Sequence, residues 1–589
     1  MNERQFGPVL TKDGARFRLW APAAKRVDVI LDKAHALERG DDGWFSAEIA
    51  GVKAGARYKF RIDDEIDVPD PASAFQPDDV FGPSELIDHA SHPWWATDWC
   101  GRPWQEAVII ETHVGAFTRE GSYRGMIEKL DHLMQSGITA LELMPLADFA
   151  GQRNWGYDGV LWYAPDSAYG RPEDLKTLID EAHRRGLMVF LDVVYNHFGP
   201  EGNFLGRYAP DFFRQAQTPW GSAIDYRVRE VRAFAIENAL TWLREYRFDG
   251  LRLDAVNSIV EPGGLSMLHD LSAAAGQLAA ETGRHIHLVL ENGDNRASVL
   301  DAAEDPPRGK YRAQWNDDYH HAWRVLMTGE KQGYYGDYQR SPLDDIARAL
   351  SSGFVYQGEI SAFRGGVARG EPSGALAPTA FINFVQNHDQ IGNRALGDRL
   401  ESVASTPAIE AALAMTLLAP AIPMLFMGEE WGSKTLFPFF CDFRGELAEA
   451  VRNGRRREYD WAYAAYGDDI PDPLEISTFQ SATLDWTARN EPAAQKRLAL
   501  VQHLLRIRRQ EIVPRLAGAA FGAARVAENR LLIAHWRMGD GATLRLLANL
   551  SDRNIVHEYS EIPGTLIWGS IPGESIPPWS VAWRLEAVI

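Results

Sequence analysis

Four apolar segments of this sequence end in side chains that could act as acids, bases or charged binding groups. In chain order these residues are Asp192, His197, Arg252, Asp254, Glu291, His388 and Asp389. A lone aspartate after a strand is usually a helix cap, but four such segment ends in succession are more than capping explains. If the segments are parallel strands of one barrel, these side chains converge on one rim, where such barrels carry their active sites.

The spacing predicts different chemistry for Asp254 and Glu291. Arg252 and Asp254 are two residues apart, so on a strand both side chains leave the same face. We expect the guanidinium to lower the pKa of Asp254, and an ionised carboxylate suits a nucleophile. Glu291 follows two apolar residues, and a poorly solvated carboxyl keeps its proton, which suits a general acid. Two such carboxyls about 5–5.5 Å apart across a glycosidic bond would cleave it with retention. His388 and Asp389 would then bind the sugar hydroxyls.

A metal centre is the competing use of the same residue types, because histidines and aspartates at barrel rims ligate zinc in hydrolases. His197 and His388 come from distant segments, and His285 and His287 lie early on theirs, away from the rim. The stretch between His197 and Phe248 holds only scattered acidic residues, too few for the oxygen ligands that calcium needs. We therefore expect no metal and no cofactor, and a metallohydrolase remains the weaker alternative.

Eight apolar runs, most of them separated by a helical pattern, must position these residues. They cover residues 108–113, 138–143, 187–194, 248–254, 285–291, 311–315, 381–386 and 422–427. Helices are expected between them, for instance at 172–185, 228–246 and 408–418, and Pro172 followed by two acidic residues is typical of a helix start. Eight strand–helix units predict an α/β fold, a (β/α)8 TIM barrel with insertions. A doubly wound parallel sheet is the alternative, but no switch point is visible.

Short strands flank the barrel on both sides. They alternate polar and apolar positions, and the segments are 16–20, 27–31 and 58–62 before the barrel and 530–536 and 544–549 after it. This pattern predicts an N-terminal β-sandwich and a small C-terminal β-domain. Proline-rich residues 68–83 cannot continue a ladder and are expected to form a linker, and a helix at 493–509 is expected to close the barrel. The predicted domains are 1–97, 98–512 and 513–589.

Composition excludes several classes of protein. The 589 residues carry a formal net charge of −20, which argues against a nucleic-acid partner or an anionic membrane surface. No run of about 18 apolar residues occurs, so we expect no membrane span. The first residues lack a basic region followed by an apolar core, so we expect no signal peptide and a cytoplasmic location. Two cysteines exclude a disulfide framework. The oligomeric state stays open.

The segments around Asp192, Asp254, Glu291 and Asp389 resemble, in order, the four signature regions of the α-amylase superfamily, glycoside hydrolase family 13. The resemblance implies that Asp254 is the nucleophile, Glu291 the general acid/base and Asp389 the stabiliser of the transition state. It further implies sugar-binding roles, and the residues are Tyr157 (in Asn154-Trp-Gly-Tyr-Asp158), His197, Arg252 and His388. We add their neighbours Asn257, Gln390 and Asn393 as candidate substrate contacts.

Within this superfamily the whole chain is similar to the hydrolases that cut the α-1,4 bond next to the terminal trehalose of a maltooligosyl-trehalose. The segments that carry the similarity are 70–77, 81–84, 111–118 and, most specifically, 315–321. Trehalose has no reducing end, and a polar cluster after the sixth strand could hydrogen-bond it. The cluster comprises Asp317, Asp318, His320 and His321. The other interpretation is that the cluster only caps the following helix.

Three further functions stay open at this point. A branching enzyme would pass the same covalent intermediate to a sugar hydroxyl, and a debranching relative would cut α-1,6 bonds. A non-enzymatic glucan-binding scaffold is disfavoured, because all three carboxylates stand at matching positions. The expected partner is an α-glucan oligosaccharide substrate.

Overall fold

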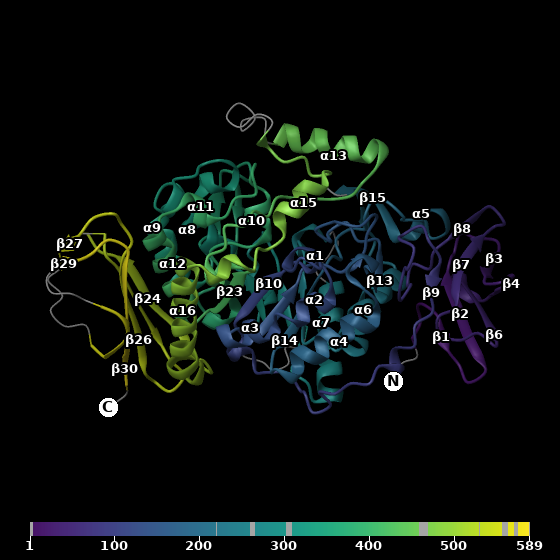
Figure 1. Cartoon of the computed structure of the whole chain (residues 1–589), viewed down its shortest axis with the longest axis horizontal. Helices are drawn as coiled ribbons and strands as arrows, with labels where there is room; N and C mark the ends of the chain where they lie inside the picture. The colour runs from purple at the N-terminus through teal and green to yellow at the C-terminus, as the bar shows by residue number, and fades with distance from the viewer. Residues whose placement is uncertain are drawn as a thin grey trace.

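The structure is a computed structural model that describes residues 4–218, 221–259, 266–301, 309–458, 469–528, 530–556, 563–570 and 575–587. Three parts lie in a row, with a barrel in the middle, the N-terminal sheets at one end and the C-terminal sheet at the other (Figure 1). No helix among the described residues has the length and apolar composition needed to cross a membrane.

Eight parallel strands close into a barrel, each paired with the next along the chain and the last with the first. They are β10 (Ile109–Thr112), β11 (Ala140–Leu143), β14 (Met188–Val193), β17 (Gly250–Leu253), β18 (His287–Leu290), β19 (Ala313–Trp315), β22 (Phe381–Asn383) and β23 (Ile422–Phe426). The helices expected from the sequence are α4 (Pro172–Arg184), α6 (Arg229–Glu245), α12 (Thr406–Leu418) and, after the eighth strand, α16 (Pro492–Ile507). The (β/α)8 prediction is confirmed, and the doubly wound sheet is excluded.

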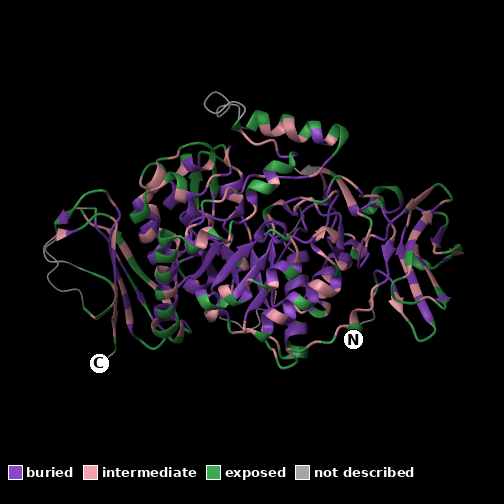
Figure 2. Ribbon diagram, in the orientation of Figure 1, coloured by how far each residue is buried: buried purple, intermediate pink, exposed green. Residues whose placement is uncertain are grey.

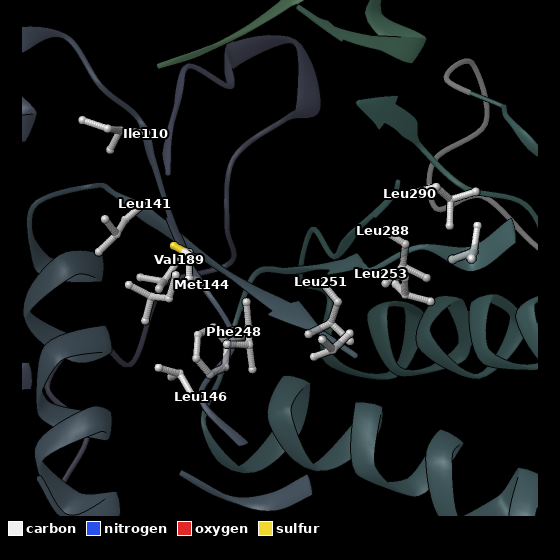
Figure 3. Close-up of a cluster of buried hydrophobic side chains, with 14 of the residues drawn as sticks. Ile110, Leu141, Met144, Leu146, Val189, Phe248, Leu251, Leu253, Leu288 and Leu290 are labelled. Carbon is white, nitrogen blue, oxygen red and sulfur yellow. The ribbon is translucent and has the colours of Figure 1, made fainter. Parts of the chain in front are cut away.

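Alternation along the barrel strands decides which side chains reach the centre. Residues such as Leu251 and Leu253 point outward and pack in the large core under the helices, part of which Figure 3 shows. A separate apolar cluster fills the inside of the barrel and includes Phe190 and Val289. Because side chains on a strand alternate with a period of two, Arg252 lies on the inner side, between its outward neighbours. The strands are buried throughout (Figure 2).

The N-terminal part is the predicted sandwich of two antiparallel sheets. One sheet has the order β1-β2-β6-β5, with β1 (Val9–Leu10), β2 (Gly14–Trp20), β6 (Trp44–Ala50) and β5 (Glu38–Arg39). The other has the order β4-β3-β7-β8, with β4 (Ala34–Ala36), β3 (Val27–Ile30), β7 (Arg57–Ile62) and β8 (Ile66–Val68). Phe17, Val29 and Phe60 form its interior and are fully buried.

The proline-rich linker is not a loose connection. It forms no strand between β8 and the short β9 (Ser84–Glu85), as predicted, but much of it is buried, including Asp70 and Phe75. Arg171, at the start of α4, lies over the Phe75 ring and pairs with Glu85 at 2.7 Å. Asp180 of α4 accepts hydrogen bonds from the next stretch of backbone, at residues 95 and 96. The segment therefore fastens the sandwich to the barrel.

The C-terminal part is a five-stranded antiparallel sheet with the order β24-β25-β26-β30-β28. Its strands are β24 (Ala520–Val526), β25 (Leu532–Arg537), β26 (Thr543–Asn549), β30 (Ser580–Glu586) and β28 (Thr565–Gly569). The sheet packs against the barrel mainly through α9 (Pro342–Ser352), where the Leu350 carbonyl accepts from the Trp536 indole at 2.8 Å, and also through α12 and α16. The predicted C-terminal β-domain is confirmed, whereas the exact domain boundaries stay a prediction.

Candidate active site

Arg252 is the centre of a cluster of carboxylates at the rim of the barrel. Its Nη1 donates to Asp192 at 2.6 Å and to Asp254 at 3.0 Å, and its Nη2 donates to Glu291 at 2.7 Å. The guanidinium also lies 3.9 Å from the centre of the Trp315 ring. The strand order places β14, β17 and β18 side by side, so one buried cation is shared by three acids from adjacent strands.

Asp254 is held in one orientation but is not made more acidic than usual. Asn196 donates to its Oδ2 at 2.7 Å, while Arg252 takes Oδ1. Burial raises the pKa of Asp254, and the Arg252 guanidinium and the contact with Glu291 offset only part of that rise. The prediction of a lowered pKa is therefore wrong, because desolvation outweighs the single cation that Asp254 shares with two other carboxylates.

Glu291 receives two hydrogen bonds on the same oxygen. Arg252 and the backbone N–H of Ala255, at 2.9 Å, both donate to Oε2. Ala255 presents that N–H from a left-handed backbone conformation with a φ of 40°, directly after Asp254. Such a conformation is strained for a residue with a side chain and is typical of functional sites. Burial and the negative charge of Asp254 raise the pKa of Glu291 although Arg252 opposes them, as expected for a general acid.

His388 and Tyr157 form an aromatic pair beside the Arg252 cluster. Their rings stack with centroids 5.0 Å apart, and the Tyr157 hydroxyl donates to Asp192 at 2.6 Å. Glu111, an inward residue of β10, accepts hydrogen bonds from both the Nδ1 and the backbone N–H of His388. Burial alone would keep His388 neutral, but the Glu111 carboxylate outweighs it and raises the pKa of His388. The charged form of the ring is thus favoured more than in a free histidine.

Asp389 is positioned by a chain of hydrogen bonds that begins outside the barrel. Asn393 donates to its Oδ1 at 2.5 Å, and Arg455 donates to the Asn393 side-chain oxygen at 2.9 Å. Arg455 belongs to α13 (Gly445–Glu458), which lies above the barrel in Figure 1. Burial raises the pKa of Asp389, and the charge of Arg455 is among those that lower it. Asn393 was predicted to contact substrate, but its polar atoms are used to position Asp389.

The four residues of the polar cluster after β19 separate into two kinds. Asp317, at the start of α8 (Asp317–Thr328), is partly exposed, and burial together with the charges of the nearby Glu291 and Asp389 raises its pKa to about 8. His321 is buried, and its Nδ1 has no partner within the described residues. These two side chains remain candidates for contact with substrate.

Asp318 and His320 are occupied by the protein itself. The two oxygens of Asp318 accept from five donors, and these donors are Asn295 Nδ2, Tyr338 Oη, Arg369 Nη1 and the backbone N–H groups of Val355 and Tyr356. His320 uses both ring nitrogens, on the Val385 carbonyl at 2.6 Å and the Tyr335 hydroxyl at 3.0 Å. The prediction that they bind substrate stays untested, and these contacts favour a structural role for both side chains, because their polar atoms already have protein partners.

Three other predicted contacts lie around the same rim. His197 bonds through Nε2 to the Tyr157 carbonyl at 3.0 Å and through Nδ1 to Asn196. Asn257 is exposed and accepts from the Gly293 N–H at 3.2 Å. Gln390 is buried and accepts from the Asn387 N–H at 3.2 Å as part of a capping box at the start of α10 (His388–Gly392). Gln390 thus has a helix-capping function rather than a visible path to substrate.

Sequence reasoning missed several members of the cluster. Glu111, Asn196 and Trp315 are as closely involved as the predicted residues. The alternation of β10 could have identified Glu111, because it shares the inner face with buried Ile109. Within the described residues, no three histidine, cysteine or acidic side chains are grouped as metal ligands would be. The expectation that no metal is needed stays a prediction.

Comparison with known proteins adds the family. Residues 104–209 match the model of the alpha-amylase catalytic domain, residues 5–73 match carbohydrate-binding module 48 (isoamylase N-terminal domain), and residues 519–583 match a domain of unknown function. A crystal structure of a Salmonella typhimurium protein, named as a candidate alpha amylase, superposes with a TM-score of 0.93 at 42% identity, and the match covers 99% of this chain and 100% of that one.

The named relatives distinguish between a branching enzyme and a trehalohydrolase. A 1,4-alpha-glucan branching enzyme of Corynebacterium jeikeium is 34% identical, but over only 43% of this chain and 39% of its own length. The malto-oligosyltrehalose trehalohydrolase of Deinococcus radiodurans is 42% identical over 503 residues, which are 85% of this chain and 82% of that protein. With this similarity and the geometry of its site, the chain belongs to the malto-oligosyltrehalose trehalohydrolase family, whose catalytic domain is an α-amylase barrel.

Proposed function

We propose that this chain is a retaining glycosidase that hydrolyses the α-1,4 bond next to the terminal trehalose of maltooligosyl-trehalose and releases trehalose. The observation that carries the proposal is the Arg252 cluster, in which Asp254 and Glu291 share one cation on adjacent strands. Membership of the trehalohydrolase family supplies the substrate class. The carbohydrate-binding module at residues 5–73 agrees with an oligosaccharide substrate.

In the first half-reaction, Glu291 gives its proton to the glycosidic oxygen as the bond from that oxygen to C1 breaks. An oxygen of Asp254 forms the new bond to C1, and trehalose leaves as a neutral alcohol. Asn196 and Arg252 orient Asp254 through its two oxygens, so little motion is needed to reach C1. Because Oε2 of Glu291 is taken by Arg252 and Ala255, Oε1 is the oxygen that carries the proton.

In the second half-reaction, water attacks C1 from the side that trehalose has left. Glu291, now ionised, takes the proton of the water, and the bond from C1 to Asp254 breaks. Asp254 returns as a carboxylate, and the shortened malto-oligosaccharide leaves with its anomeric configuration retained. The net change is the addition of one water molecule across the glycosidic bond.

Asp389, His388 and Tyr157 are proposed to surround the sugar ring on which positive charge develops in the transition state. Asp389, positioned through Asn393, is proposed to bind the ring hydroxyls more strongly as the transition state forms. His388 is held by Glu111 and stacks on Tyr157, which leaves an aromatic face for the sugar. These roles agree with those that the family resemblance implies.

Recognition of trehalose is proposed to depend on Asp317 and His321 rather than on the whole polar cluster. With its pKa raised to about 8, the Asp317 carboxyl is protonated at neutral pH and can donate a hydrogen bond to a sugar oxygen. A site built on such bonds rejects a ligand that leaves its buried polar groups unpaired. Asp318 and His320 are proposed to hold the start of α8 in place through their own hydrogen bonds to the protein.

Two substrates test the proposal. The purified protein is incubated with maltotriosyl-trehalose and, separately, with maltopentaose, and the products are separated by chromatography. We expect free trehalose and maltotriose from the first substrate and much slower cleavage of the second. Equal rates on both substrates would contradict the trehalose specificity. A shifted iodine spectrum of amylose without new reducing ends would instead identify a branching enzyme. The cytoplasmic location stays a prediction, which cell fractionation would test.

A further inference from the structure

A groove of about 700 Å³ lies between the outer helices of the barrel and the edge of the C-terminal sheet. Trp568 on β28 and Trp579 in the turn before β30 line it on the side of the sheet. Glu410 of α12, with Lys496 and His503 of α16, lines it on the side of the barrel. None of these residues belongs to the Arg252 cluster or to the polar cluster after β19.

An irregularity in the edge strand brings Trp568 to this groove. Within the described residues β28 pairs with β30 alone, and the register between them shifts between Leu566 and Trp568, as at a β-bulge. Bulges bend a strand and redirect a side chain. Gly569, the next residue, has a φ of 82°, and a Cβ there would lie 1.9 Å from the Val581 carbonyl oxygen. The strand thus depends on a glycine to hold this shape, and the Trp568 ring stays partly exposed beside His503, with centroids 5.4 Å apart.

A second irregularity, separate from the first, brings Trp579 to the same groove. Its φ is 50°, a left-handed conformation that costs an aromatic residue on the order of 1–3 kcal/mol. The indole N–H donates to the Asp552 carboxylate at 2.7 Å, which fixes the ring. The indole N–H therefore already has a protein partner at the surface, and the rest of the partly exposed ring is apolar. A packing role alone does not require two unusual backbone conformations in one groove.

The chemistry of the groove fits a neutral sugar better than a charged ligand. Lys496 and Glu410 bring opposite charges, so the groove does not select an anion or a cation. Flat indole rings pack against the apolar face of a pyranose, and the ionisable side chains across the groove can hydrogen-bond its hydroxyls. The volume falls in the range of small-molecule sites.

We propose that this groove is a second binding site for an α-glucan chain, outside the active site. The choice of glucan as occupant rests on the proposed function, because the substrate of that function carries a malto-oligosaccharide chain. Holding one part of a long glucan here raises the effective concentration of its ends at the barrel rim. The C-terminal domain, for which the matching family model gives no function, would thereby take part in substrate capture.

Binding is measured on the full chain by affinity electrophoresis in gels that contain amylopectin. All variants carry Glu291→Gln, so that the glucan is not cut during the run. We expect Trp568→Ala and Trp579→Ala each to weaken retention at least about five-fold. Trp95→Ala is the matched control, because Trp95 is 74% exposed and lies in the segment between the sandwich and the barrel. The N-terminal module is present in every variant, so its own binding cancels.

A blocking substitution protects the test against misfolding. Ser570 is exposed and lines the groove, so Ser570→Arg fills the space without removing a packed side chain. We expect it to weaken retention as much as the tryptophan variants. In a protein that keeps Glu291, Ser570→Arg should hydrolyse maltotriosyl-trehalose at the parent rate. This hydrolysis assay tests the proposed function separately from glucan binding in the groove. If folded Ser570→Arg were retained in the gel like the parent, the proposal would be overturned. It would also be overturned if light scattering showed that the parent is a dimer and that Ser570→Arg is a monomer, because the groove would then be a contact between two copies of the chain.

Discussion

Two buried arginine–carboxylate clusters lie near the same rim and do different things. Arg252 is one cation shared by three carboxylates, and the pKa values of all three are raised. Arg369 pairs at 3.0 Å with one carboxylate, Asp318, whose oxygens are saturated by further donors. The first cluster has fewer cations than acids and contains the proposed catalytic carboxylates, whereas in the second the single carboxylate has its own cation and further donors. Burial is the main cause of the raised pKa values in the first cluster, and one arginine shared by three acids offsets only part of it.

Removing one acid from the Arg252 cluster should have the largest effect. Asp254→Asn removes the nucleophile without changing the shape of the side chain, so we expect kcat to fall by at least about 10⁴-fold. Calorimetric binding of maltotriosyl-trehalose and the thermal midpoint should stay close to those of the parent. Turnover within ten-fold of the parent would place the nucleophile elsewhere.

Removing the acid from the Arg369 cluster should instead cost stability. Asp318→Asn leaves the Arg369 charge buried and turns an amide N–H toward other donors, so we expect a loss of about 3 kcal/mol in the free energy of unfolding. Chemical denaturation measures it, with Asp317→Asn as the neighbouring control. If Asp318→Asn kept its stability and lost only specificity for trehalose, the assignment of the two clusters would have to be reversed.

The pH dependence of stability sharpens the contrast between Asp317 and Asp318. Because its pKa is raised to about 8 in the folded state, Asp317 binds its proton more tightly when folded. Between pH 4 and pH 8 the folded protein therefore holds more protons than the unfolded one, and stability falls as pH rises. Asp317→Asn should remove part of this loss and gain on the order of 1 kcal/mol over the parent at pH 8 relative to pH 5. Parallel stability curves for the two proteins would contradict a raised pKa.

The smallest effect on kcat is expected at the edge of the Arg252 cluster. Arg455 is hydrogen-bonded to Asn393, which in turn donates to Asp389, so Arg455 is a positioning residue, and its charge also lowers the pKa of Asp389. Arg455→Ala should lower kcat about ten-fold and change KM little, because the contact with Asp389 matters most in the transition state. Arg455→Lys should restore part of the loss, and Arg457→Ala, an exposed neighbour on α13, should not change kcat. An equal loss in both alanine variants would indicate a general effect of α13.

The barrel could be predicted from the sequence because its strands are short apolar runs with polar residues at their ends. The rule that such ends converge also brought Arg252, Asp254 and Glu291 together correctly. The direction of the pKa of Asp254 could not be predicted in the same way. It depends first on how deeply Asp254 is buried and then on which acids share Arg252, and both are set by which strands are neighbours in space.

The polar cluster after β19 shows a second limit. Asp317 and Asp318 are adjacent and identical in type, yet consecutive helical positions point about 100° apart, so only one of them is turned toward the catalytic carboxylates. The partners that saturate Asp318 come from residues 295 to 369, and no spacing in the sequence indicates them. Likewise, the link from Arg455 to Asp389 is a tertiary contact between distant segments.

The buried proline-rich segment has a practical consequence for handling this protein. Phe75 and Glu85 are held by Arg171 of the barrel, and Glu237 of α6 accepts hydrogen bonds from the backbone of Gln5 and Phe6. A truncated version that starts at the barrel would expose apolar surface and would remove the partners of Arg171 and Glu237. We therefore expect the catalytic part produced without the N-terminal sandwich to aggregate, because the sandwich covers part of the barrel surface.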